Sequence, residues 1–102
     1  MIAERDGQLW VSGDVNQSTV AKLLPQGEAL VREADRVVNL GQIEAVDSAA
    51  VALLLGWLRA ARAAGRKLVI AEAPQAFVSL ASLYGVTPML FPDAGSAQQD
   101  QH

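Results

Sequence analysis

The chain contains no cysteine, and its only histidine, His102, is the last residue. Without cysteine there is no disulfide framework and no thiolate metal site. A Ser-His-Asp or Cys-His catalytic group, or a histidine-rich metal site, cannot be built around a terminal histidine in a polar stretch. The sequence also lacks the common glycine-rich phosphate-binding loops. These absences predict a protein that is not an enzyme and that uses no metal or other cofactor.

Basic residues are fewer than acidic ones, with 8 Lys and Arg against 11 Asp and Glu, which gives a formal net charge of -3. Nucleic-acid binding favours a basic balance with clustered cations, so we expect no nucleic-acid partner. The longest apolar run is far shorter than the roughly 20 residues of a membrane-spanning helix, which argues against direct membrane insertion. The first residues show no charged-then-apolar run of a signal peptide, which predicts a cytoplasmic location.

A chain of 102 residues fits one domain with a single core. Hydrophobic residues make up 51% of it and charged residues 19%, which is typical of a globular rather than a disordered chain. We expect the folded domain to cover residues 1–91. The small, polar residues of 92–102 predict a flexible C-terminal tail.

The first third of the chain predicts a hairpin followed by a helix. Asp6-Gly7 is a favoured two-residue turn and separates the short segments 2–5 and 8–12. Residues 13–16 then form a predicted turn, and Asn16 with Thr19 three residues later is a typical helix start. Pro25 and Gly27 predict a kink or a break in that helix.

The rest of the chain predicts alternating strands and helices. Residues 36–40 and 67–71 are short apolar runs that favour buried, parallel strands, and 41–45 is predicted to be a loop. A helix led by Pro74 and stopped at Gly85 carries apolar residues at helical spacing.

Between the two apolar runs, Asp47 and Ser48 open a strongly apolar helix that ends near Gly65. One helix face supplies a core stripe. It consists of Val51, Leu54, Leu55 and Leu58. A second apolar face contains Leu53 and Trp57, and its role has two interpretations. Either the domain itself covers this face, or the face is an exposed surface that docks a partner protein with Trp57 as its anchor.

The order of these elements resembles the STAS domain. The resemblance covers roughly residues 6 to 91 and rests on the Val46-Asp47-Ser48 step with the apolar helix after it, the Arg66–Ile70 strand, and Leu83-Tyr84-Gly85-Val86. It implies an α/β fold with a mixed, mostly parallel sheet of about four to five strands, an N-terminal hairpin and interspersed helices. The family usually has Asp-Leu where this chain has Asn39-Leu40, and a glycine at the position of Ala50.

The STAS family includes the MlaB-type subunits of bacterial ABC systems that transport phospholipids and maintain outer-membrane lipid asymmetry. The resemblance therefore implies a non-catalytic adaptor that binds and regulates an MlaF-type ATPase subunit, in a complex with a permease. Such a protein would be cytoplasmic and peripheral to the inner membrane. The partner-binding residues that this resemblance implies are Asp47, Ser48, Ala49, Ala52, Leu53 and Trp57.

The family also includes anti-sigma factor antagonists. In these proteins a kinase phosphorylates the position of Ser48, and the added charge of roughly two units next to Asp47 would repel a docked partner. A third hypothesis is a small-ligand or lipid-binding module that uses a cleft between the first helix and the sheet, although no cluster of polar residues marks such a pocket.

Overall fold

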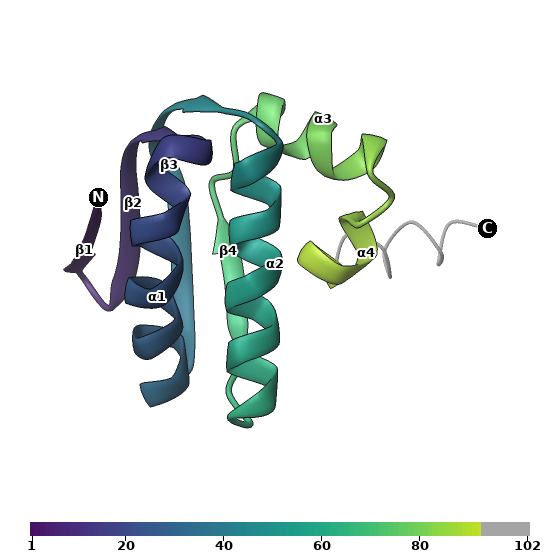
Figure 1. Ribbon diagram of the computed structural model, residues 1–102. Coiled ribbons are helices and arrows are strands. Elements are labelled where there is room, and N and C mark those ends of the chain that lie inside the picture. The colour runs from purple at the N-terminus through teal and green to yellow at the C-terminus, as the bar shows by residue number, and fades with distance from the viewer. Residues whose placement is uncertain (93–102) are drawn as a thin grey trace.

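The computed structural model describes residues 1–92 and has one mixed sheet with helices on one face (Figure 1). The strand order is β1-β2-β3-β4, so each strand lies next to the strand that precedes or follows it along the chain. Helices α1 and α2 lie side by side across the sheet, and α3 and α4 lie beyond α2 (Figure 1). The α/β architecture predicted from the sequence is therefore confirmed. Residues 93–102, which form most of the predicted tail, lie outside the described residues.

The N-terminal hairpin is confirmed. Strands β1 (Ile2–Arg5) and β2 (Gln8–Val15) pair antiparallel, and only Asp6 and Gly7 separate them. Both turn residues have positive φ, 53° and 76°, which is the backbone geometry that two-residue hairpin turns require. Strand β2 is longer than predicted, because it continues through residues 13–15, for which the sequence predicted a turn.

Strand β3 (Arg36–Val46) lies parallel to β2 and to β4 (Leu68–Ala71). The loop predicted for residues 41–45 is wrong, because this segment continues β3 and pairs with the second half of β2. Two register shifts interrupt the pairing of β2 with β3. They explain why buried and exposed residues do not alternate regularly along these strands.

Helix α1 (Gln17–Glu33) begins at the predicted capping box, in which Asn16 and Thr19 each accept a hydrogen bond from the backbone of the other. Of the predicted kink or break at Pro25, the break does not occur, because α1 is one helix with Pro25 inside it. Pro25 is exposed, whereas Gly27 is buried against α2. Packing against α2 thus keeps α1 continuous despite two residues with poor helix propensity.

Helix α2 (Ser48–Ala63) ends as predicted next to Gly65, whose φ is 72°. Helix α3 (Gln75–Leu83) follows Pro74, and a short α4 (Thr87–Leu90) completes the described chain. Phe77 of α3 is buried and contacts Phe91 edge to face at 6.2 Å between ring centroids. None of the helices in residues 1–92 is long and apolar enough to cross a membrane.

The two faces of the sheet differ. The face covered by α1 and α2 contributes buried aliphatic side chains to the core, among them Leu9, Val11, Val38 and Leu40. On the opposite face, the Arg5 guanidinium lies 4.7 Å from the centre of the Trp10 ring and donates to Gln42 Oε1. No helix of the described residues covers this face, and the stacked Arg5 and Trp10 side chains cover part of it instead.

Candidate protein-docking site at the start of helix α2

Strand β3 leads directly into α2, because Asp47 is the only residue between Val46 and Ser48. Asp47 Oδ1 accepts a hydrogen bond of 2.8 Å from the Ala49 N–H, as predicted for an N-cap. Asp47 and Ser48 are both exposed. Because Ser48 is the first residue of α2, its hydroxyl lies at the positive end of the helix dipole.

A shallow hollow of about 320 Å³ adjoins Ser48. It is lined by Gln17, Val20, Ser48, Ala49 and Ala52. Three of the residues that line it have small side chains, so the two helices leave a recess between them at this end. Sequence analysis did not assign the two α1 residues to the site. The periodicity of α1 shows that Val20 lies on its apolar face, but only the packing of α1 beside α2 brings it next to Ser48.

Trp57 and Leu53 do not contribute to an exposed surface. Both are fully buried, with 0% relative exposure, and belong to the core. The Trp57 indole Nε1 donates a 3.0 Å hydrogen bond to the Leu24 carbonyl, and the ring packs on Gly27. Of the two interpretations of this helix face, the exposed docking surface is therefore wrong for these two residues, because α1 already covers them.

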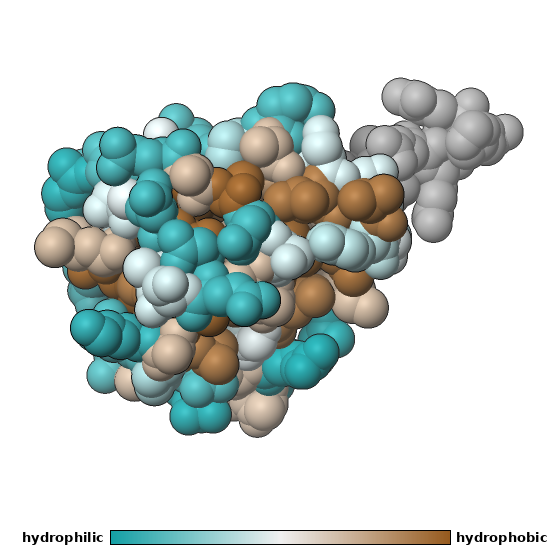
Figure 2. Space-filling view, turned by 45° about the horizontal axis from the view of Figure 1, so that its top comes forward, coloured by the Kyte–Doolittle hydropathy of each residue, from teal (hydrophilic) through white to brown (hydrophobic). Residues whose placement is uncertain are grey.

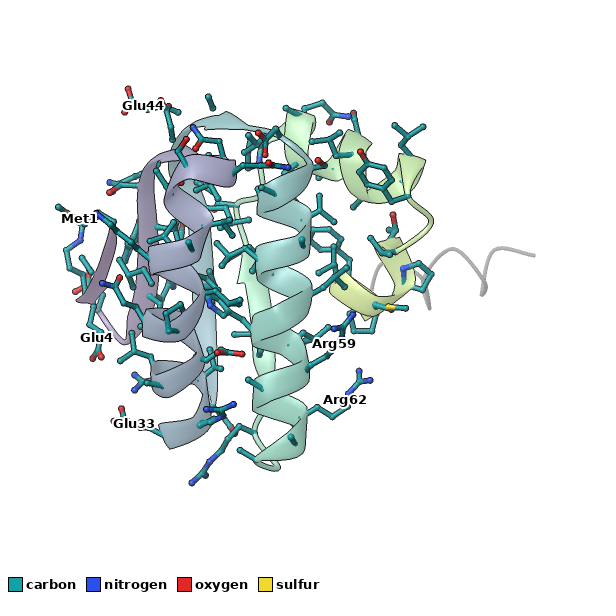
Figure 3. All side chains as sticks on the ribbon, viewed as in Figure 1. Met1, Glu4, Glu33, Glu44, Arg59 and Arg62 are labelled. Carbon is teal, nitrogen blue, oxygen red and sulfur yellow. The ribbon has the colours of Figure 1, made fainter. Side chains whose placement is uncertain are left out.

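The remaining predicted site residues divide between the surface and the recess. Asp47, Ser48 and Ala52 are exposed, and Ala49 is buried at 8% exposure but still lines the hollow. Glu44 is also exposed and projects outward at this end of the molecule (Figure 3). The structure thus places the Ser48 hydroxyl, the Asp47 carboxylate and a recess with small apolar side chains together at the start of α2.

A polar network around the buried Asn39 lies on the other face of the sheet. Asn39 is 1% exposed; its Nδ2 donates to Gln8 Oε1 at 3.1 Å and to Glu72 Oε2 at 2.6 Å. Its Oδ1 accepts from the Gly41 N–H at 2.8 Å. Because the amide both donates and accepts, Asn39 satisfies a carboxylate and a peptide N–H that an aspartate could not satisfy together.

The hollow next to the hairpin has a single charged side chain in its lining. A hollow of about 390 Å³ lies between α1 and the hairpin, where the lipid-binding hypothesis expects a cleft, and its only charged side chain is Lys22. No group of three or more potential metal ligands occurs within residues 1–92.

The mixed sheet, the two helices across one face and the exposed serine at the start of α2 define a STAS domain. A family model described as "Mlab, STAS domain" matches residues 2–91, and the chain belongs to this family. STAS domains act through protein–protein interaction, which agrees with a site that consists of an accessible contact surface.

A solved structure with the same fold is that of the anti-sigma factor antagonist SpoIIAA in its unphosphorylated form. The match covers 98% of this chain and 96% of that chain, with a TM-score of 0.69 and 13% sequence identity. At this identity the likeness shows the fold alone. No curated protein matches the chain.

Proposed function

We propose that the protein is a non-catalytic adaptor that docks on the ATPase subunit of a phospholipid-transporting ABC system through the start of α2. The observation that carries this proposal is the exposed Ser48 next to a recess between α1 and α2, in a chain of the Mlab family. Bound to an ATPase and its permease, the protein would be peripheral to the inner membrane and would regulate ATP hydrolysis without catalysing it.

The shape of the site supports docking by insertion. The recess has small residues on its α2 side, so an apolar side chain of the partner fits between α1 and α2 while Ser48 forms a hydrogen bond at its rim. Burial of an apolar side chain contributes about 1.5–3 kcal/mol, enough to make one such contact a centre of the interface. The contact residues in this proposal are Asp47, Ser48, Ala49 and Ala52, together with Gln17 and Val20.

The test is purification of the tagged protein from its native cells as wild type, Ser48→Glu and Ser82→Glu. Ser82 is an exposed serine on α3, away from the proposed site, and serves as the matched control. We expect an ABC ATPase and a permease to co-purify with wild type and Ser82→Glu but not with Ser48→Glu. Equal recovery with all three proteins would contradict docking at Ser48.

The alternative function is an anti-sigma factor antagonist switched by phosphorylation at Ser48. Exposure of the Ser48 hydroxyl at a helix N-terminus favours this alternative, because the helix dipole stabilises an added phosphate. Mass spectrometry of the protein from native cells, with fragmentation to locate any phosphate, distinguishes the two functions. A phosphate on Ser48 and recovery of a kinase in place of the transporter subunits would support the antagonist.

A further inference from the structure

A second hollow lies at the opposite end of α2 and has a different chemical character. Its volume is about 420 Å³, and it lies between the end of α2, strand β4 and α4. Three cations, Arg62, Arg66 and Lys67, line it together with apolar side chains. Ser48 is 14 residues before Arg62, or roughly 20 Å along the helix axis, so one partner segment at Ser48 leaves this hollow free.

Among the described residues, the cations at this hollow form no salt bridge with an acidic side chain. Arg59, Arg62, Arg66 and Lys67 comprise half of the Lys and Arg residues of the chain. Within residues 1–92, the only salt bridges are those of Arg36 with Glu4 and Glu33. Arg59 and Arg62 leave α2 on the side where α4 lies (Figure 3), and of these two Arg62 lines the hollow. In the sequence these basic residues fit the end of a helix; in the fold Arg62, Arg66 and Lys67 line a recess.

Large apolar side chains are exposed next to these cations. Val69 is 54% exposed and Met89 is 53% exposed, and both line the hollow. Figure 2, which brings the top of Figure 1 forward, shows that hydrophobic residues also gather towards α3 and α4 at the other end of the molecule. An occupant therefore needs both carboxylates and apolar side chains.

Strand β4 is an edge strand with free peptide groups at this hollow. It pairs only with β3, and the Lys67 carbonyl accepts from the Arg36 N–H. In a parallel ladder, the N–H and C=O of one residue point to the same neighbouring strand, and those of the next residue point to the opposite side. The N–H and C=O groups of Leu68 and Ile70 therefore point away from β3. No backbone hydrogen bond within residues 1–92 uses this outer edge.

We propose that an extended, acidic segment of a partner protein binds here by adding a strand to β4. Its backbone would pair with Leu68 and Ile70, its Asp or Glu side chains would contact Arg62, Arg66 and Lys67, and its alternate apolar side chains would enter the hollow. The concave shape disfavours a flat lipid surface, and the clustered cations disfavour a second copy of the same edge because like charges repel. This interface is separate from the proposed docking site at Ser48 and does not depend on it.

The first experiment titrates the full chain, labelled with ¹⁵N, with an end-blocked peptide of about eight residues in which Glu alternates with Val. We expect saturable binding with the largest amide shifts at Leu68 and Ile70. The double variant Arg62→Glu/Arg66→Glu should weaken binding by at least about tenfold, whereas Lys22→Glu, which changes an exposed cation on α1, should not. Shifts that map elsewhere, or equal affinity of the double variant and wild type, would overturn the proposal.

The second experiment tests strand addition itself. The same peptide is N-methylated at every second amide in each of two frames, which removes the donors of one strand edge at a time while keeping all charges. We expect one frame to abolish binding and the other to retain it, so equal behaviour of both frames refutes strand pairing. Vesicles of phosphatidylglycerol provide the last comparison. Sedimentation of the wild-type protein with them that is lost in Arg62→Glu/Arg66→Glu, together with no binding of the peptide, would assign the surface to lipid instead.

Discussion

Replacing Gly27 by alanine tests the central contact between the two long helices. A Cβ at this position would lie 2.0 Å from Trp57 Cε2 and 2.2 Å from both Cζ2 and Nε1. These distances are far inside van der Waals contact, and the ring that they meet is rigid, fully buried and hydrogen-bonded to Leu24. The indole would have to move, which would also disturb that hydrogen bond.

The magnitude follows from two opposing effects. Alanine is better than glycine inside a helix by about 0.5–1 kcal/mol, which by itself would stabilise the protein. Overpacking of a core costs about 1–3 kcal/mol, and loss of a hydrogen bond adds about 1 kcal/mol. We therefore expect Gly27→Ala to lower the free energy of unfolding by about 2 kcal/mol.

Urea denaturation followed by circular dichroism measures this change, with Gly56→Ala as the control. A Cβ at Gly56 would lie 2.8 Å from Leu24 Cδ1, the end of a flexible side chain, so the free energy of unfolding should change by less than about 1 kcal/mol. In a Trp57→Phe background, whose ring lacks the indole nitrogen, the penalty of Gly27→Ala should shrink by about 1 kcal/mol. Unchanged or higher stability of Gly27→Ala in the wild-type background would refute the argument from close packing.

Two further changes test the buried residues of the domain. Asn39→Asp places a second carboxylate against Glu72, whose Oε2 now lies 2.6 Å from Asn39 Nδ2. We expect the free energy of unfolding in urea to fall by about 1–3 kcal/mol, and Glu72→Gln in addition to restore most of it. No recovery in the double variant would contradict the network. Trp57→Ala should cost about 3–5 kcal/mol of stability, so that any loss of partner in co-purification accompanies loss of folded protein; a stable variant that lost only its partner would contradict the burial of this ring.

The short-range features of the fold were predictable because local chemistry determines them. Asp6-Gly7, the capping box of Asn16 and Thr19, and the stop at Gly65 each depend on hydrogen bonds or backbone angles within a few residues. The extension of β3 to Val46 and the continuity of α1 through Pro25 depend on contacts with distant strands and helices. Local patterns carry little information about such contacts.

The candidate site shows the same division. The N-cap role of Asp47 was predictable from residue type, and so was the exposure of a polar step at the start of a helix. The sequence left open whether the domain covers Trp57 or exposes it as an interface anchor, because it shows two apolar faces on α2 but does not show that a glycine on α1 makes room for an indole. The packing of α1 places the ring in the core.

The direct passage of β3 into α2 has a consequence for detecting a bound partner. Because Asp47 is the only residue between strand and helix, no loop separates Ser48 from β3, so a partner that holds Ser48 in place also restricts the opening of the last peptide groups of β3. These groups pair only with β2, because β4 reaches no further along β3 than Asn39. Slower amide hydrogen exchange in residues 42–46 would therefore report occupancy of Ser48 from inside the sheet, without a label on the contact surface.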